Sequence, residues 1–315
     1  VIVDFVAERR GFLLRDVPAF RKFAGGAAAN VAVGLSRLGT RSAFIGRVGD
    51  DSFGRFLAGE LRRNHVDTRG LLSDPKHKTR LAFVSLTSAG DRDFEFWEHQ
   101  PADEQLKKRD FNRTVLRNAR IVHFSSFLLL KEPSRSAVLQ ISRELKKEGR
   151  FVSFDPNIRL SLWRSKREVG KIMGKMIRSA TILRLNADEA RLLSGSRNIQ
   201  NAARILRKNG PSIVAVTLGK GGCYFLTGNG EGFVAGFRVK AVDTTGCGDG
   251  FLAGLIDGII KTGKDPDTIS ENEMRDICSR ANAGGGITAG KRGVFNALPD
   301  RTAVQKFLAQ HSKNR

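Results

Sequence analysis

Cysteine, tyrosine and tryptophan are scarce in this chain of 315 residues. Its three cysteines, Cys223, Cys247 and Cys278, lie far apart and form no Cys-x-x-Cys pair. Because zinc sites and disulfide frameworks need closely spaced or evenly numbered cysteines, we expect neither. We expect three reduced thiols, as is usual in the cytosol. One tyrosine and two tryptophans also provide little for a surface on which nucleic-acid bases could stack.

Long apolar runs are missing as well. No stretch reaches the roughly 18 apolar residues that predict a membrane-spanning helix. The opening VIVDFVAERR is too short, and has the wrong flanks, for a signal peptide. It lacks an initiator methionine and is typical of the middle of a β-strand, so we expect the natural N-terminus to lie upstream. We predict a cytoplasmic protein that does not enter the membrane.

Positive charge is in large excess, with 54 Lys and Arg against 32 Asp and Glu and a net charge of +22. Such a balance is found in many nucleic-acid-binding proteins. Here the basic residues are spread over helix-like segments with acids between them, as in ELKKEGR (144–150), which indicates a solvated surface. We expect the positive field to attract small anions such as ATP, and we expect no nucleic-acid partner.

The order of predicted elements indicates one α/β domain over residues 1–315. Strand-like and helix-like segments alternate at 41–49, 51–64, 120–126, 133–147, 150–157, 165–178, 181–186, 199–208 and 212–219. Alternation of this kind favours a mainly parallel central sheet flanked by helices on both faces. The alternative architecture is a (β/α)₈ barrel. The uneven spacing of the strands and an extra hairpin count against it.

That hairpin is predicted at residues 79–97, TRLAFVSLTSAGDRDFEFW, where two strand patterns flank a turn containing glycine. The segment 11–24 could pair with the hairpin. Together they would form a small sheet attached to the main one. We predict a β-sheet lid, formed by about 8–24 and 79–100, in position to cover a binding site.

The segment AVDTTGCGDGFLAG (241–254) places an acid among glycines at the start of an apolar helix. The N–H groups of Gly246, Cys247 and Gly248, ahead of a helix N-terminus, would form an anion hole. An acid in that turn repels phosphate, and accepting a proton from an attacking hydroxyl would explain its presence. The alternative is that Asp249 only caps the helix. We interpret the turn as a site of phosphoryl transfer with Asp249 as the base.

Glycines also precede the helix predicted in AGGAAANVAVGLSRLGT (24–40). Gly25 and Gly26 would let a ligand approach the backbone closely. Asn30 lies in the first turn, where its amide could bind sugar hydroxyls. The alternative is a glycine-rich turn before a tightly packed alanine helix, and the segment alone leaves both interpretations open.

The segment LNADEARLLSG (185–195) follows a predicted strand. Asn186 and Glu189 have the spacing of a capping box, with Asn186 as the N-cap. The alternative is a polar pair that holds hydrated Mg²⁺ near phosphates, since Mg²⁺ often keeps several waters and needs few carboxylates. The segment alone favours the cap.

Two further glycine-rich segments differ in what they indicate. In VTLGKGG (216–222), Thr217 and Gly219 follow a buried strand, at the edge where open α/β sheets bind ligands. GGITAGKRG (285–293) nearly matches a P-loop, but Arg292 stands where a hydroxyl residue is needed and a helix-like segment precedes it. We therefore do not interpret it as a P-loop.

Taken together, these segments resemble the ribokinase-like (PfkB) family of sugar kinases over nearly the whole chain. The glycine pair and Asn30 are similar to the first family signature, and DTTGCGDGF (243–251) is similar to the second. NADE (186–189) matches the family's Asn-x-x-Glu motif. FDPNIRLSLW (154–163) and PADEQL (101–106) are similar to the fructokinase branch.

The resemblance implies a ribokinase-like fold and ATP-dependent phosphorylation of a sugar hydroxyl. Asp249 would be the general base, and the amides of Gly246, Cys247 and Gly248 would stabilise the moving phosphoryl group. Glu189 would hold Mg²⁺, through water. The other implied roles are sugar binding by Asp4, Gly25, Gly26, Asn30 and Arg159, nucleotide binding by Asn186, Thr217, Gly219, Gly222, Gly248 and Asn282, and monovalent cation (K⁺) binding by Asp243, Thr245 and backbone carbonyls near 284–293.

Within the family, the resemblance favours a fructokinase that makes fructose 6-phosphate. Glu98 stands in a segment where many fructokinases carry an arginine. The alternatives are kinases for 2-keto-3-deoxygluconate, ribose or a nucleoside. An inactive kinase-like protein bound to nucleic acid, or a pure sugar-binding protein, would not need Asp249 in an anion hole. Relatives often dimerise through lid strands, so the resemblance also implies a homodimer.

Overall fold

The computed structural model describes residues 1–9, 11–86, 92–97 and 100–312. The strands are β1 (Ile2–Ala7), β2 (Phe20–Gly25), β3 (Ala43–Gly49), β4 (Asp67–Asp74), β5 (Leu81–Leu86), β6 (Arg92–Trp97), β7 (Ile121–Ser125), β8 (Phe151–Asp155), β9 (Ile182–Asn186), β10 (Ile213–Thr217), β11 (Cys223–Leu226) and β12 (Glu231–Val234). The helices are α1 (Ala27–Arg37), α2 (Ser52–Arg63), α3 (Arg113–Asn118), α4 (Ser134–Lys147), α5 (Lys166–Ser179), α6 (Ala187–Ser194), α7 (Ile199–Arg207), α8 (Cys247–Thr262), α9 (Glu271–Thr288), α10 (Val294–Ala297) and α11 (Arg301–Ser312).

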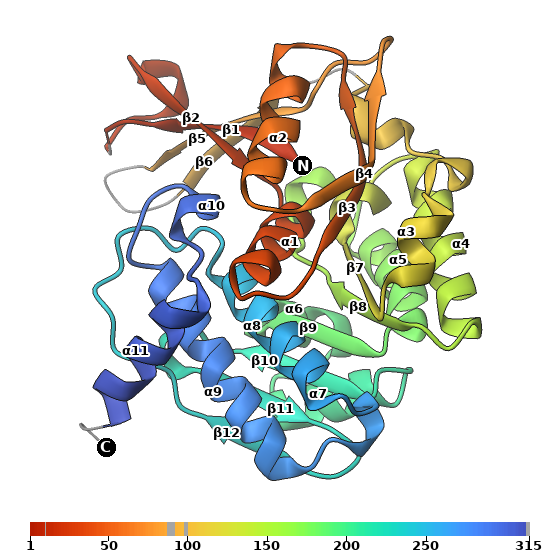
Figure 1. The fold of residues 1–315 in the computed structure, drawn as a ribbon, viewed down its shortest axis with the longest axis vertical. Helices are drawn as coiled ribbons and strands as arrows, with labels where there is room; N and C mark the ends of the chain where they lie inside the picture. Colours follow the sequence, from red (N-terminus) through yellow and green to blue (C-terminus); the bar gives the residue numbers. More distant parts are fainter. Residues whose placement is uncertain (10, 87–91, 98–99, 313–315) are drawn as a thin grey trace.

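The largest sheet has six strands in the order β12-β11-β10-β9-β8-β7 (Figure 1). Strands β7 to β10 run parallel, and β11 and β12 form an antiparallel hairpin at one edge. Parallel strands end at the same edge of a sheet, so their last residues come together. Ser125 pairs with Asp155, and Asn186 with Thr217, in register at that edge. Polar side chains from distant segments therefore meet there.

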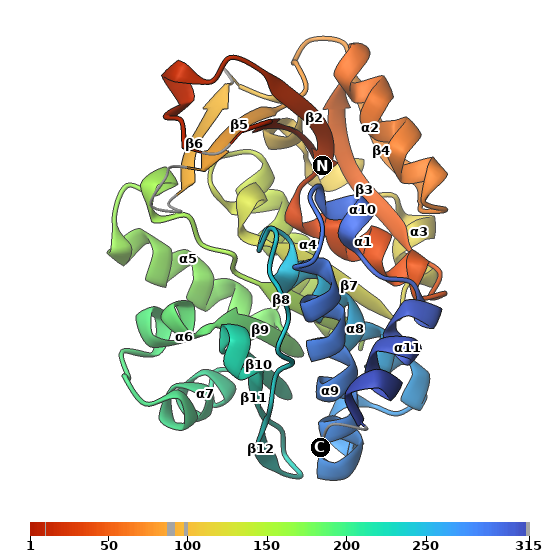
Figure 2. The same ribbon diagram turned by 90° about the vertical axis from the view of Figure 1, so that its left-hand side faces the viewer.

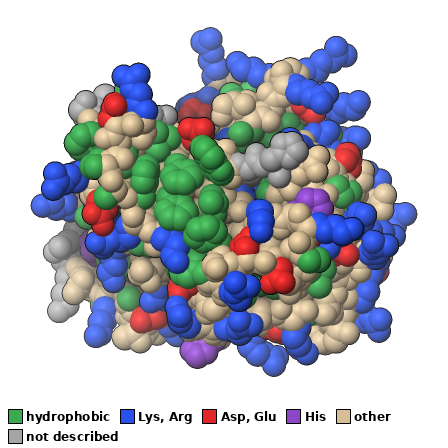
Figure 3. Space-filling model, turned by 90° about the horizontal axis from the view of Figure 1, so that it is seen from above, with side chains coloured by type: hydrophobic (Ala, Val, Ile, Leu, Met, Phe, Trp, Pro, Cys, Tyr) green, Lys and Arg blue, Asp and Glu red, His purple; other side chains and the backbone are tan. Residues whose placement is uncertain are grey.

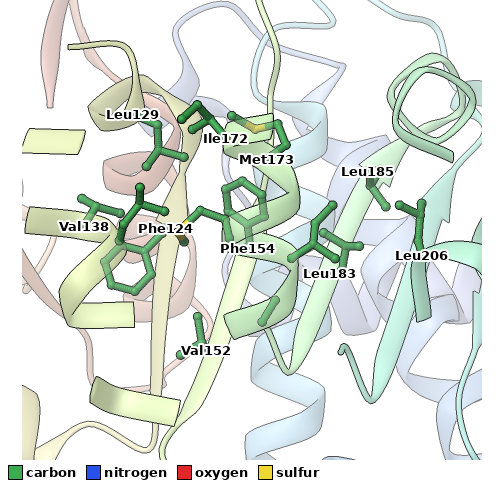
Figure 4. Close-up of a cluster of buried hydrophobic side chains, with 14 of the residues drawn as sticks. Phe124, Leu129, Val138, Val152, Phe154, Ile172, Met173, Leu183, Leu185 and Leu206 are labelled. Carbon is green, nitrogen blue, oxygen red and sulfur yellow. The ribbon is translucent and has the colours of Figure 1, made fainter. Parts of the chain in front are cut away.

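Helices cover both faces of this sheet, as the alternating pattern predicted (Figure 2). On one face, α4, α5, α6 and α7 bury side chains against the strands, and ten of the residues in this cluster are labelled in Figure 4. On the other face, α1, α8 and α9 pack against the sheet around Ile182, Ala215 and Phe225. Fully burying one such large apolar side chain contributes about 1.5–3 kcal/mol. The two layers thus hold the polar edge of the sheet in place.

A second, four-stranded sheet has the order β2-β1-β5-β6. The predicted hairpin is present, since β5 and β6 pair antiparallel from Leu81↔Trp97 to Leu86↔Arg92. The pairing expected for segment 11–24 is wrong. Only its end forms a strand, β2, and that strand pairs with β1, which lies between β2 and β5. The central place suits β1 because Val3 is fully buried and the Phe5 ring stacks on Phe83 at 5.1 Å.

Parts of the predicted lid lie outside the described residues, namely 10, 87–91 and 98–99, and Glu98 is among them. Strands β3 and β4 form a separate parallel pair. Among the residues described, no helix is both long and apolar enough to cross a membrane. The three cysteines form no disulfide in this part of the chain.

Candidate active site

The glycine turn predicted at 246–248 begins α8. Gly246 is the N-cap residue and has a left-handed backbone with φ 77°. A side chain there would be strained, and its Cβ would lie 2.3 Å from Val294 Cγ1. The first amides of a helix have no acceptor within the helix. The Cys247 amide donates to the Thr244 carbonyl oxygen at 3.4 Å. The turn therefore has the polarity of an anion site.

Asp249 lies in the first turn of α8, but it is not the N-cap residue. Its carboxylate oxygen Oδ2 accepts a hydrogen bond of 2.6 Å from Asn30 Nδ2. These residues are 219 positions apart in the chain, and packing of α1 on α8 brings them together. Gly34 makes this packing possible, because a Cβ there would lie 2.6 Å from Ala253 Cβ. The interpretation of Asp249 as a mere cap is therefore wrong.

The surroundings of Asp249 raise its pKa into the neutral range. The side chain is 7% exposed, and burial raises its pKa to about 7 because a charge is costly to remove from water. The Asn30 hydrogen bond, Arg184 and Arg159 act in the opposite direction, while Asp155 raises the pKa further. A carboxylate with such a pKa can accept a proton efficiently at neutral pH.

Asp4 and Gly25 form a second part of the site. A Cβ on Gly25 would lie 2.0 Å from Asp4 Oδ2, so only glycine leaves room for this carboxylate. Burial and the nearby Asp249 and Asp243 raise the pKa of Asp4 to about 7. Gly26 is the N-cap residue of α1, with φ 102°. The tight-packing interpretation of segment 24–40 is confirmed for α1, whose residues 29–34 are buried, and Asn30 nevertheless faces the site.

Asn186 and Glu189 form a complete capping box on α6. The Glu189 amide donates to Asn186 Oδ1 at 2.9 Å, and the Asn186 amide donates to Glu189 Oε2 at 2.9 Å. Glu189 Oε1 accepts from the Ile158 amide at 2.7 Å. The capping interpretation is confirmed. Both carboxylate oxygens of the buried Glu189 hold backbone amides, which suits contact with a metal ion through water better than direct ligation.

Arg184 was missed in the sequence. It lies in β9, is 8% exposed, and donates from Nη1 to Asp155 Oδ2 at 2.8 Å and from Nη2 to Thr217 Oγ1 at 2.6 Å. The hydroxyl that we predicted to face a nucleotide is thus bound to this guanidinium. An arginine within the apolar strand TILRLN (181–186) was the available signal, because charged residues are rarely buried without a partner or a task.

Three residues predicted to bind a nucleotide come from the turn between β10 and β11, which holds Gly219 and Gly222, and from α9, which holds Asn282. Gly219 and Gly222 have positive φ, and a Cβ on Gly222 would lie 2.1 Å from the Val234 carbonyl oxygen. Asn282 Nδ2 donates to the carbonyl oxygens of Val234 and Ala235 at 3.1 and 3.2 Å. These contacts fix the loop that follows β12.

The residues predicted to hold a monovalent cation also lie together. Asp243 Oδ1 accepts from the Thr245 amide at 2.9 Å and from the Thr245 hydroxyl at 2.6 Å. The Ala289 carbonyl oxygen accepts from the amides of Val242 and Asp243 at 2.7 and 3.1 Å. The loop before the glycine turn is therefore tied to the end of α9, although this carbonyl is already occupied by amides.

A cavity of about 1150 Å³ joins several of these groups. The predicted residues on its walls are Asp4, Gly26, Asn30, Arg159, Asn186, Thr245, Gly246, Gly248 and Asp249. Arg184, Asp103 of the PADEQL segment, and the lid residues Phe94 and Phe96 also line it. Gly219, Gly222 and Asn282 are not among the described residues that form these walls. The volume exceeds that of a site for one small ligand.

Comparison with known proteins decides the family. The model of the pfkB family of carbohydrate kinases matches residues 1–301. The chain belongs to this family. This pfkB-family kinase is 40% identical over 311 residues to probable fructokinase-4 of Arabidopsis thaliana, covering 98% of this chain and 94% of the relative. It is 39% identical to fructokinase-2 of Solanum lycopersicum, with 98% and 94% covered.

Solved structures agree with this family. A fructokinase from Xylella fastidiosa superimposes with a TM-score of 0.90 at 27% identity, covering 99% of this kinase and 96% of that chain. A fructokinase from Vibrio cholerae O395, in a form with fructose, ADP and calcium ion bound, has a TM-score of 0.84 at 31% identity, with 98% and 96% covered. Aminoimidazole riboside kinase from Salmonella enterica has a TM-score of 0.82 at 30% identity, with 98% and 97% covered. The predicted ribokinase-like fold and carbohydrate kinase activity are confirmed.

Proposed function

We propose that this kinase transfers the γ-phosphoryl group of ATP to the 6-hydroxyl of D-fructose, with Asp249 as the general base. The observation that carries the proposal is the position of Asp249. Its carboxylate is buried on the cavity wall, has a pKa of about 7, and adjoins the glycine turn at the start of α8. The likeness to plant fructokinases supports fructose as the acceptor.

In the proposed reaction Asp249 accepts the proton of the attacking hydroxyl. The amides of Gly246, Cys247 and Gly248 stabilise the negative charge on the moving phosphoryl group. Phosphoryl transfer needs little covalent chemistry from the protein, so positioning and electrostatic stabilisation supply most of the rate. General base catalysis alone contributes about 10²–10⁴-fold.

We assign the sugar end of the cavity to Asp4, Gly25, Gly26, Asn30 and Arg159. Asn30 donates its amide hydrogen to Asp249, and its Oδ1 is buried with no hydrogen-bond partner among the described residues. A sugar hydroxyl would satisfy that oxygen while it lies beside the base. Burying an acceptor without a partner costs about 1–3 kcal/mol, which favours binding of a polyol here.

We assign Asn186, Thr217, Gly219, Gly222, Gly248 and Asn282 to the nucleotide. Mg²⁺ would be held through water by Glu189, whose two oxygens already hold amides, and it would shield the phosphate charges during transfer. K⁺ would be held by Asp243 and Thr245. The oxygen-rich character of both groups suits these hard cations.

We also propose a homodimer formed through the lid. Hydrophobic side chains gather on the face of the molecule seen in Figure 3, which is the side of the lid in Figure 1. Within the lid strands, the rings of Phe5, Phe20 and Trp97 each contact the ring of Phe83, and Trp97 is 68% exposed. A cytoplasmic protein without a nucleic-acid partner remains our expectation.

The test is an assay of ADP release with fructose, ribose, 2-keto-3-deoxygluconate and aminoimidazole riboside as acceptors. We expect the highest kcat/KM with fructose, and fructose 6-phosphate as the product. A clear preference for another acceptor would replace fructose while leaving the role of Asp249 intact. No turnover with any acceptor would contradict the proposal as a whole.

A further inference from the structure

Arg184 lies directly beneath the glycine turn. If Gly248 carried a Cβ, that atom would lie 2.6 Å from Nη1, 2.7 Å from Nη2 and 2.9 Å from Cζ of the guanidinium. Gly248 therefore lets the backbone of the first turn of α8 rest against this cation. The same guanidinium lines the cavity beside Asp249 and Asn186.

The contacts of the Arg184 guanidinium do not use all of its N–H donors. An arginine side chain has five N–H donors. Asp155 and Thr217 accept from one Nη atom each, and Nε is buried with no partner among the described residues. Buried donors of this kind are rare unless a ligand completes them. Arg184 is thus a buried cation with unused donors, next to amides that already form an anion site.

A purely structural ion pair explains these contacts less well. The Asp155 carboxylate already has a second donor, because its Oδ1 accepts from the Asn157 amide at 3.1 Å. Replacing a buried ion pair by apolar residues is often neutral or stabilising. The local charge also matters, since Asp155, Glu189 and Asp249 all interact electrostatically with Arg184. Without this cation, three carboxylates would repel the phosphates of an incoming nucleotide.

We propose that Arg184 binds the phosphoryl group during its transfer, and that Asp155 and Thr217 are positioning residues for it. This inference rests on the proposed function. The sugar oxygen forms the new P–O bond and loses its proton to Asp249. The bond from the γ-phosphorus to the bridging oxygen breaks, and its electron pair leaves with ADP. Arg184 forms no covalent bond, and its N–H groups hold the oxygens of the group in transit.

The guanidinium of arginine is always charged, and its N–H donors are arranged so that they can bind two phosphate oxygens at once. Removing one donor that stabilises a transition state typically lowers the rate by about 10²–10³-fold. Asp155 and Thr217 hold the Arg184 guanidinium from β8 and β10, the two strands beside β9. Its orientation is therefore fixed before the nucleotide binds. An arginine held in this way would contact the phosphoryl group far more strongly in the transition state than it contacts ADP.

The experiment compares Arg184→Gln, Arg184→Lys and the wild type in binding ADP alone, and ADP with tetrafluoroaluminate and saturating sugar, by calorimetry. For Arg184→Gln we expect ADP affinity within about threefold of wild type, and a loss of about 10²–10³-fold for the fluoroaluminate complex. Arg184→Lys should recover part of this loss. Equal losses for both ligands, or no loss for either, would overturn the inference.

Two further variants separate this role from folding. Asp155→Asn combined with Arg184→Gln removes both charges of the ion pair, so Asp155 is not left as a buried unpaired carboxylate, and the double variant should show the same selective loss. Arg135→Gln removes a partly buried arginine that pairs with Glu168 at 3.0 Å on another part of the molecule, and it should bind both ligands as the wild type does. If the wild type forms the complex only with a sugar other than fructose, fructose is excluded and Arg184 is tested with that sugar.

Discussion

Burial of Asp249 stabilises its protonated form. Its pKa is about 7 in the folded protein and near 3.8 in the unfolded chain, so the folded state binds the proton more tightly. A raised pKa of this kind gives stability that is fully present at low pH and is lost as the pH rises through about 7. Ionisation of the Asp249 carboxylate therefore lowers the stability of the folded protein at the pH where the reaction requires the ionised form.

Asp249→Asn should consequently be more stable than the wild type at pH 8, because it removes a buried charge while its amide oxygen can still accept from Asn30. The difference should shrink toward pH 5, where the wild-type carboxyl is protonated. Thermal unfolding of both proteins across this range measures the effect. A variant that is less stable than the wild type at every pH would contradict the expected destabilisation by the buried charge of Asp249.

Gly25 is required by the carboxylate beside it. Gly25→Ala would place a Cβ 2.0 Å from Asp4 Oδ2, so Asp4 must move. We expect the KM for the sugar to rise at least tenfold with a smaller change in the KM for ATP. The control is Gly59→Ala in α2, where a Cβ meets open space. That change should leave both KM values unchanged and add about 0.5–1 kcal/mol of stability. Equal kinetic effects of the two changes would refute the role of Gly25.

At the scale of elements, Asp51 joins α2 to the start of the lid hairpin. Its carboxylate caps α2 by accepting from the Gly54 amide at 2.8 Å. It also accepts from the amide and hydroxyl of Thr79 at 2.9 and 2.8 Å. Thr79 lies two residues before β5, so this one side chain holds the lid strand against the body of the protein.

Asp51→Ala should lower the free energy of unfolding by about 1–2 kcal/mol through loss of the cap, and should also raise the KM for the sugar. Asn198→Ala is the matched control, because Asn198 caps α7 by accepting from the Asn201 amide at 2.9 Å and makes no hydrogen bond to the lid residues that the structure describes. The control should lose similar stability without a change in KM. Urea unfolding and steady-state kinetics measure both quantities, and a parallel rise in KM for the two variants would show that the anchor has no special role.

The pattern of the sequence predicts the central strands well, because alternating or continuous apolar runs such as 212–219 are compatible with few structures other than a strand. It misses β4, whose sequence DTRGLLSD mixes charged and turn residues with only two adjacent leucines. It also misplaces segment 11–24, because the partner of an edge strand depends on tertiary packing. Within the site, the acid and the glycines of 246–249 were visible as a local motif, whereas the Asn30–Asp249 bond and the Arg184–Thr217 bond join distant segments and needed the fold.

At the scale of the whole molecule, the exposed aromatic face of the lid predicts an assembly. We expect a dimer in solution, and Trp97→Asp should shift it to the monomer because a charge would be buried in the interface. Phe233→Asp is the control, since Phe233 is 52% exposed on β12, far from the lid strands in Figure 1. Sedimentation velocity measures the outcome. A wild-type monomer, or equal dissociation by both changes, would contradict assembly through the lid.

The molecule as a whole places one buried base between the polar edge of a parallel sheet and a lid. Asp4, Asn30, Arg184 and the glycine turn all adjoin that base, and they come from four separate segments. The account therefore depends on a single carboxylate more than on any other group.

The most direct test is the turnover of Asp249→Asn with MgATP and fructose across pH 5.5 to 8.5. The account predicts that wild-type kcat/KM falls with decreasing pH as a group of pKa near 7 is protonated. It predicts that the variant is slower by about 10²–10⁴-fold in kcat, with no dependence on that group. Turnover by Asp249→Asn close to that of the wild type, with the same pH profile, would contradict it.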